Sequence, residues 1–226
     1  MKQDVFSYQL KYRGKPVGRQ TLTEARQGRV TLLGSKLLLQ GAFGNATVTQ
    51  DSRYLEEPGL SLSYNEETQD KGGKRSFQVT FDRENGLIKA RKGSDRSELP
   101  LMRPYLDPLS LLHRLRRPAG DERFRVPMLG HDVTVERLGE KELTTSLGIR
   151  RALVFTLKPG RNAVFVDAEA PHHILMLTQI VDGQQLDAQL VKVDREDAPV
   201  PKANGGRKRK SRSRRRRRRR SQKRPS

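Results

Sequence analysis

One segment interrupts a chain that otherwise follows β-strand patterns: Tyr105-Leu-Asp-Pro-Leu-Ser-Leu-Leu-His-Arg-Leu-Arg-Arg-Pro118. Asp107 can cap a helix whose first position is Pro108, where the missing N–H costs nothing and the fixed φ angle is already helical. The leucines recur at spacings of three and four, which gives a helix one apolar face. Arginines near its end favour the negative end of the helix dipole, and Pro118 ends the run. The segment therefore predicts one short helix near 107–117, inserted between two β-rich halves.

The residues before this helix alternate apolar and polar side chains, as half-buried strands do. Phe6, Tyr8 and Leu10 lie on one face at a period of two. Two turn-forming dipeptides, Gly72-Gly73 and Asn85-Gly86, predict hairpin turns between later strands. The second pair suits the positive φ angles of a two-residue type I′ turn.

The residues after the helix predict a second series of strands. Its first five members are expected at Phe124–Met128, Asp132–Leu138, Lys141–Leu147, Arg151–Leu157 and Ala163–Ala168. A last hairpin joins Ile174–Val181 to Gln184–Val193 through Asp182-Gly183, again a type I′ signal.

Short strands spaced about ten residues apart, with hairpin turns and one helix, predict an all-β, mainly antiparallel fold. We expect a strongly curved sheet that forms a barrel, a half-barrel or a sandwich. Crossover helices are missing, which disfavours a parallel α/β fold. The expected organisation is a curved β domain at 1–194, a Pro- and Gly-containing linker at 195–206, and a disordered Arg-rich tail at 207–226.

The charge of the chain is concentrated at its C-terminal end. The formal net charge is +20, and residues 202–226 contribute fifteen Lys or Arg and no acidic side chain. The remaining residues hold 31 basic and 26 acidic side chains, so the body is only mildly basic. The tail has too little apolar surface to offset the entropy of ordering, and we expect it to be disordered when free.

The tail predicts a non-enzymatic protein that binds the phosphates of RNA or DNA with little sequence specificity. Arg presents a planar fork that matches phosphate, and no aromatic side chain is interleaved to stack on bases. Two other interpretations stay open: docking on an anionic membrane or another polyanion, and an incidental polybasic extension. The expected phosphate-binding residues are Arg207, Lys208, Arg209, Lys210, Arg212, Arg214, Arg215, Arg216, Arg217, Arg218, Arg219 and Arg220.

Three further motifs are Tyr12-Arg-Gly-Lys-Pro-Val-Gly18, Leu106-Asp-Pro-Leu-Ser-Leu-Leu-His-Arg-Leu-Arg116 and Glu142-Leu-Thr-Thr-Ser-Leu-Gly148. Together they resemble the bacterial DUF3108 family, whose function is unknown. The resemblance would cover about residues 4–193. It implies a β-rich, barrel-like or half-barrel domain, usually exported to the cell envelope, and it supplies no catalytic residues. The polyarginine tail is a feature that the family pattern does not require.

The family resemblance also supports an alternative function. A barrel-like domain could hold a lipid or another apolar ligand inside, with the tail docking the protein on an anionic membrane. Phe6, Tyr8, Phe77 and Phe81 are the expected lining, although the same residues suffice for a packed core.

No other pattern predicts catalysis, a cofactor or a metal. The chain has no Cys, and its four histidines include the adjacent pair His172 and His173, which would point to opposite faces of a strand. Asp132, Glu136 and Asp167 are possible acid and base groups, yet no spacing brings them together. The N-terminus shows no export signal, so we expect a cytoplasmic protein, or an envelope protein if translation starts upstream. The sequence does not indicate an oligomeric state.

Overall fold

The fold is taken from a computed structural model, which describes residues 1–117, 122–128, 130–181 and 183–198. The predicted Arg-rich tail and most of the predicted linker lie outside these residues. Fourteen strands and one α-helix account for most of the described chain. The strands are β1 (Lys2–Tyr12), β2 (Lys15–Gln27), β3 (Val30–Leu39), β4 (Ala46–Leu55), β5 (Leu60–Asp70), β6 (Gly73–Asp82), β7 (Leu87–Lys92), β8 (Asp95–Pro100), β9 (Arg123–Met128), β10 (His131–Thr145), β11 (Gly148–Lys158), β12 (Asn162–Asp167), β13 (Ile174–Val181) and β14 (Gln184–Asp197). The α-helix is α1 (Pro108–Leu115), and a short 3₁₀ turn, η1, spans Gly41–Phe43.

All fourteen strands belong to one antiparallel sheet built from two meanders. The spatial order is β8-β7-β6-β5-β4-β3-β2-β1-β14-β13-β12-β11-β10-β9. The chain therefore starts at the centre of the sheet, runs outward to β8, crosses through α1 to β9 at the opposite edge, and returns to pair β14 with β1. Because β1 and β14 are neighbours, the N-terminus lies beside the end of the last strand.

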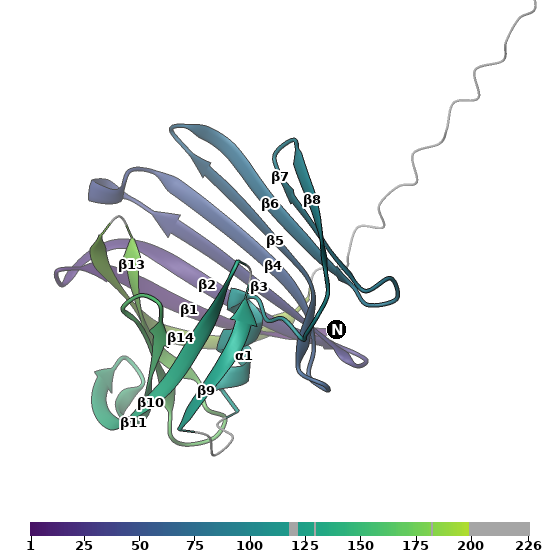
Figure 1. The fold of residues 1–226 in the computed structure, drawn as a ribbon. Helices are drawn as coiled ribbons and strands as arrows, with labels where there is room; N and C mark the ends of the chain where they lie inside the picture. The colour runs from purple at the N-terminus through teal and green to yellow at the C-terminus, as the bar shows by residue number, and fades with distance from the viewer. Residues whose placement is uncertain (118–121, 129, 182, 199–226) are drawn as a thin grey trace, which may run out of the picture.

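The sheet curves strongly around α1 but does not close, as Figure 1 shows. Its free edges are β8 and β9. The crossing segment before α1 lies between β5 and β9, since Ser61 N–H donates to Tyr105 O (2.9 Å) and Leu106 N–H donates to Pro127 O (3.1 Å). Strands β6 to β8 continue the same sheet beyond this point, at the upper right of Figure 1, and are called the wing below. The all-β, half-barrel form of the prediction is thus confirmed.

The main core lies between the concave face of the sheet and α1. Leu109, Leu111 and Leu115 of the helix are buried there, together with inward side chains such as Phe6 and Leu10 of β1. A smaller core lies under the wing and consists of Val79, Phe81 and Ile88, with Tyr105 stacked on Phe81 at a centroid distance of 5.9 Å. The period-two pattern of β1 therefore marks the inward face.

Two sequence predictions for the helix and the second series of strands differ from the structure. The helix is confirmed but spans Pro108–Leu115, with Asp107 as its cap, rather than 107–117. Residues 132–138 and 141–147 were expected to form two strands, whereas they lie in the single strand β10. A bulge with Gly139 at φ 125° shifts the register there and interrupts the alternation that a strand normally shows.

The remaining differences concern a turn and a boundary. Strands β6 and β7 are joined by the four residues Arg83–Gly86, in which Gly86 has a positive φ and Asn85 does not, so this is not a type I′ turn. The Asp82 carboxylate instead accepts from Asn85 N (3.1 Å) and Nδ2 (2.9 Å). Strand β14 continues to Asp197, because Asp4 to Lys2 of β1 pair with Arg195 to Asp197.

Candidate functional site

Asp107 anchors the start of α1 to the sheet. Its side chain is fully buried, and Oδ1 accepts from the backbone N–H of Leu109 (2.9 Å) and Ser110 (3.1 Å). Oδ2 accepts from the hydroxyls of Ser52 in β4 and Ser61 in β5, both at 2.6 Å. One carboxylate thus caps the helix and fixes its distance from two strands.

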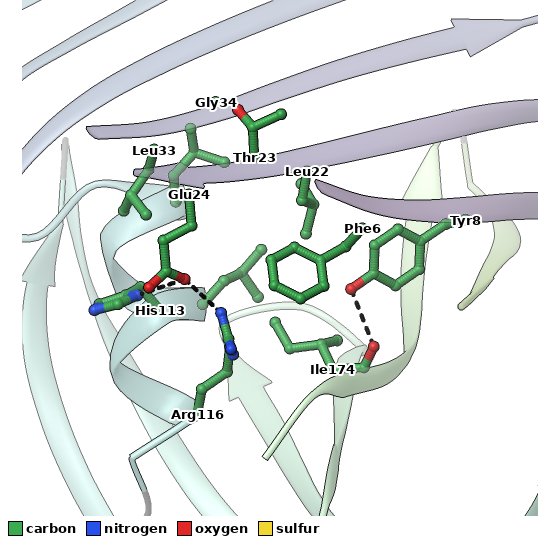
Figure 2. A pocket seen from close by; sticks show the side chains of 12 residues that line it. Phe6, Tyr8, Leu22, Thr23, Glu24, Leu33, Gly34, His113, Arg116 and Ile174 are labelled. Carbon is green, nitrogen blue, oxygen red and sulfur yellow. Dashed lines mark hydrogen bonds and ion pairs between the residues drawn. The ribbon is translucent and has the colours of Figure 1, made fainter. Parts of the chain in front are cut away.

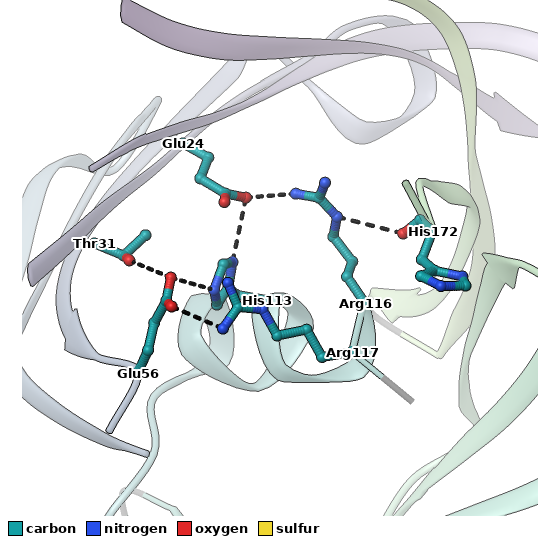
Figure 3. A network of polar contacts seen from close by, with 7 residues as sticks. All are labelled: Glu24, Thr31, Glu56, His113, Arg116, Arg117 and His172. Carbon is teal, nitrogen blue, oxygen red and sulfur yellow. Dashed lines mark hydrogen bonds and ion pairs between the residues drawn. The ribbon is translucent and has the colours of Figure 1, made fainter. Parts of the chain in front are cut away.

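The other end of α1 is held by a network of charged side chains (Figure 3). His113 lies between two carboxylates, with Nδ1 3.2 Å from Glu24 Oε2 and Nε2 3.5 Å from Glu56 Oε1. Arg116 pairs with Glu24, and Arg117 Nη1 pairs with Glu56 Oε2 at 2.7 Å. The helix is therefore tied by ion pairs to β2 and to the residue that follows β4.

The network keeps both carboxyl groups ionised. Burial alone would raise the pKa of Glu24, but the contact with His113 and the charges of His113, Arg116 and Arg117 outweigh it and lower that pKa. The pKa of Glu56 is lowered in the same way, since hydrogen bonds from Arg117 and Thr31 outweigh the effect of burial. Both carboxylates are engaged by the helix, so their role in this arrangement is to position α1.

A narrow cleft of about 30 Å³ lies beside this network (Figure 2). Phe6, Tyr8 and Ile174 form its apolar wall, with the Arg116 guanidinium 4.7 Å from the centroid of the Phe6 ring. Tyr8 Oη donates to Ile174 O (3.0 Å), and burial raises the pKa of this phenol. A water needs about 10–15 Å³ of such space, so the cleft has room for two or three waters and no larger ligand.

A larger cavity of about 320 Å³ also borders α1 and shares Leu109 and Leu112 with the narrow cleft. It is bounded by the helix, by β2 to β4 of the first meander, and by β9 to β13 of the second. This volume is at the lower end of the roughly 300–1,000 Å³ typical of ligand pockets. Fourteen of the twenty-one lining residues are apolar, polar groups cover nearly as much of the accessible wall as apolar ones, and none of the described lining residues is Asp, Glu, Lys or Arg. Its apolar lining consists of Leu37, Val48, Pro108, Leu109, Leu111, Leu112, Met128, Val133, Leu157, Pro159, Ala163, Val164, Leu177 and Ile180.

Neutral polar groups lie on the first-meander wall of this cavity. Gln20 of β2 and Ser35 of β3 are buried there, and Gln20 Nε2 donates to Ser35 Oγ (3.2 Å). Gln50 of β4 lies beside them and donates through Nε2 to Glu66 Oε2 (3.0 Å). Across the cavity the second meander contributes further uncharged or weakly basic groups, namely His131, Asn162, Thr178 and Gln179. The cavity therefore suits a neutral molecule with a large apolar part.

The four aromatic residues expected to line a ligand cavity do not share one. Phe6 and Tyr8 border the narrow cleft, Phe77 packs at the edge of the main core, and Phe81 belongs to the core of the wing. Gln20, Ser35 and Gln50, which do line the large cavity, were not expected. In the sequence, the only indication of such residues is that a polar side chain alternates in phase with apolar ones that are buried. Which face of the strand is buried can be known only once the strand register is known.

The possible acid and base residues lie apart and are engaged in separate ion pairs. Asp132 pairs with Arg103 (2.7 Å) and Glu136 with Lys158 (2.8 Å), while Asp167 lies 3.9 Å from Arg150.

His172 and His173 follow a turn before β13 rather than lying within a strand, and His173 packs edge-on against Phe6 at 5.5 Å. Within the described residues, no three acidic or histidine side chains form a metal-binding group. The predicted phosphate-binding arginines and lysines at 207–220 lie outside the described residues.

None of the helices in the described part of the chain is long and apolar enough to cross a membrane.

Comparison with known proteins agrees with the fold. A crystal structure described as a beta-barrel-like protein of domain of unknown function DUF1849 from Brucella abortus is similar, with a TM-score of 0.55 and 11% identity. The alignment covers 87% of this chain and 98% of that one, which shows a shared fold. A search of curated proteins gives no match. The family described as protein of unknown function DUF3108 matches residues 7–185, most of the curved sheet and all of α1. The chain therefore belongs to the DUF3108 family.

Proposed function

We propose that the folded domain binds a neutral, largely apolar ligand, such as a lipid, in the cavity between α1 and the sheet. The observation that carries this proposal is the cavity of about 320 Å³, in which fourteen of the twenty-one lining residues are apolar and none of the described ones is Asp, Glu, Lys or Arg. Apolar lining favours burial of hydrocarbon, and the lack of charge leaves an ionic group without a partner.

The anchoring of α1 supports the same function. The helix contributes Pro108, Leu109, Leu111 and Leu112 to the cavity wall and is fixed at both ends, by Asp107 and by the charged network. A wall fixed in this way keeps the cavity formed without a ligand, and preorganisation reduces the cost of binding.

Native mass spectrometry of the full chain, purified without detergent, tests this proposal. We expect a protein peak carrying one additional small molecule, which organic extraction of the sample should release as an uncharged lipid. A protein that carries no adduct, and that also fails to take up a neutral apolar probe, would contradict it.

A second function is proposed for the tail: binding of RNA or DNA phosphates without base preference. The observation that favours it is compositional, since residues 202–226 carry fifteen basic and no acidic side chains. Each phosphate contact releases condensed counterions, so binding by such a tail depends steeply on salt. Docking of the tail on an anionic membrane is the alternative, and it would place the ligand-binding domain at a lipid surface.

Two binding assays separate these roles of the tail, each with the full chain and with a chain ending at Pro201. One is an electrophoretic assay with nucleic acid across a range of salt concentrations, and the other measures binding to lipid vesicles. Binding of nucleic acid that the truncation abolishes supports the first. Binding only to vesicles containing anionic lipid supports the second.

A further inference from the structure

One buried polar atom in the cavity wall has no partner. Gln20 is only 6% exposed, and its Nε2 donates to Ser35 Oγ at 3.2 Å. Its Oε1 is buried without a hydrogen-bond partner among the described residues. Buried acceptors in native proteins are almost always satisfied by protein, water or ligand, and the position of Gln20 in the cavity wall puts its free acceptor within reach of a bound ligand.

The register of the sheet places this atom against apolar surface. Gln20 pairs with Leu37 of β3, which in turn pairs with Val48 of β4, so the three side chains form one row on the concave face. Ser35 and Gln50 form the adjacent row. Hydrocarbon can therefore lie along Leu37 and Val48 while a polar group reaches Gln20.

The pair of Gln20 and Ser35 has a definite hydrogen-bonding capacity. Gln20 Oε1 is free to accept from a donor, and Ser35 Oγ, which already accepts from Gln20, can still donate its own proton. A hydroxyl group both donates and accepts, so it matches this pair, whereas an ester or an ether has nothing to donate to Oε1. No Asp, Glu, Lys or Arg lies among the described lining residues to pair with an ionised head group.

We propose that Gln20 and Ser35 form a recognition site for the hydroxyl of a neutral amphipathic ligand, an aliphatic alcohol or an acylglycerol. This proposal rests on the proposed function of the cavity and adds the polar group that the ligand carries. The hydroxyl donates to Gln20 Oε1 and accepts from Ser35 Oγ, and the aliphatic part lies on Leu37 and Val48.

Two uncharged probes of matched chain length test the site: dodecanol, which has a hydroxyl, and methyl dodecanoate, which has none. Each is titrated against the full chain carrying the neutral fluorophore N-phenyl-naphthylamine, and its displacement is followed. Because both competitors are uncharged, the basic tail does not distinguish between them. We expect dodecanol to bind about tenfold more tightly, as one hydrogen bond in a buried site allows.

The variant Gln20→Leu removes the acceptor and keeps a side chain of similar size. It should bind dodecanol about tenfold more weakly while binding of methyl dodecanoate changes little. Gln78→Leu, the same replacement at an exposed site of β6, is the matched control and should leave both affinities unchanged. Thermal unfolding of each variant shows that it is folded before titration.

The outcomes separate the two proposals. Equal affinity for the two competitors, with no effect of Gln20→Leu, would overturn hydroxyl recognition and leave ligand binding by the cavity standing. Failure of the fluorophore and of both competitors to bind would overturn both proposals. Should Gln20→Leu fail to fold, Ser35→Ala provides the same comparison through the other partner of the hydroxyl, and its selective loss of dodecanol affinity is the expected result.

Discussion

Replacing Asp107 with Ala should lower the free energy of unfolding by about 4 kcal/mol, because one side chain satisfies four donors. Loss of the two bonds to the backbone of α1 removes a helix cap, worth about 1 kcal/mol. Loss of the two bonds from Ser52 and Ser61 leaves buried hydroxyls without their carboxylate, at about 1.5 kcal/mol or more each. In a domain of this size such a change lowers the melting temperature by roughly 8–16 °C.

Urea denaturation followed by circular dichroism measures this change. Asp107→Asn keeps an oxygen for the cap and an amide that can donate to the hydroxyls, so it should cost less than half as much as Asp107→Ala. The exposed Asp95 of β8 provides the matched control, and its replacement by Ala should change stability by less than about 0.5 kcal/mol. A loss for Asp107→Ala no larger than that of Asp95→Ala would refute the role of Asp107 as the anchor of α1.

Three further predictions concern the charged network, the narrow cleft and the tail. The folded-state pKa of Glu24 is lowered from 4.5, so the stability that its carboxylate contributes is complete above that pH and is lost as the pH falls through the lowered pKa. Glu24→Gln should therefore destabilise the protein at neutral pH and make its stability, measured by urea denaturation, depend less on acid pH. An unchanged acid dependence would contradict this. Tyr8→Phe should cost about 1 kcal/mol in the same assay, since Ile174 O loses its buried donor, whereas no cost would show that this bond is immaterial. If the tail makes about eight phosphate contacts, the logarithm of the binding constant for duplex DNA should fall with the logarithm of salt concentration at a slope of roughly −7. A chain ending at Pro201 should lose this dependence on salt. The same slope after truncation would assign DNA binding to the folded domain.

The local part of the fold was predictable from sequence, and α1 shows why. Asp107, Pro108 and the spacing of the leucines are neighbours in the chain, so their geometry is set by the helix itself. Ser110 completes the capping box within the same turn. The bonds from Ser52 and Ser61 to Asp107 join residues 46 or more positions apart, and no local pattern indicates them.

The cavity wall was not predictable for a related reason. Gln20 lies in a segment that the sequence shows only as a polar strand, and polar strand residues usually face solvent. Its inward direction follows from pairing with Tyr8, which faces the core. That pairing depends on a register that includes a shift between Leu10 and Lys11 of β1, and such a shift reverses the face of every residue beyond it.

The edge of the sheet shows the same limit. Every residue of β8 is exposed, so Asp95–Pro100 has no apolar alternation to mark it as a strand. It is a strand because its backbone pairs with β7, from Leu87↔Pro100 to Lys92↔Asp95. Two series of short strands could be inferred from alternation, whereas the order of the strands and the open edges depend on contacts between distant residues.

The central claim, that the cavity beside α1 holds a neutral apolar ligand, is tested most directly by blocking the cavity. Val48 of β4 lines the cavity, and the larger side chain of Val48→Trp should fill part of it. The chain otherwise contains no Trp. Val191→Trp, at an exposed position of β14, is the matched control.

The measurement is a titration of N-phenyl-naphthylamine, excited directly, against the full chain and both variants. The account predicts saturable binding to the unmodified protein and to Val191→Trp, and binding at least about tenfold weaker to a folded Val48→Trp variant, since the lost apolar contact is worth more than about 1.4 kcal/mol. Equal binding to all three proteins, or no saturable binding to any of them, would contradict it.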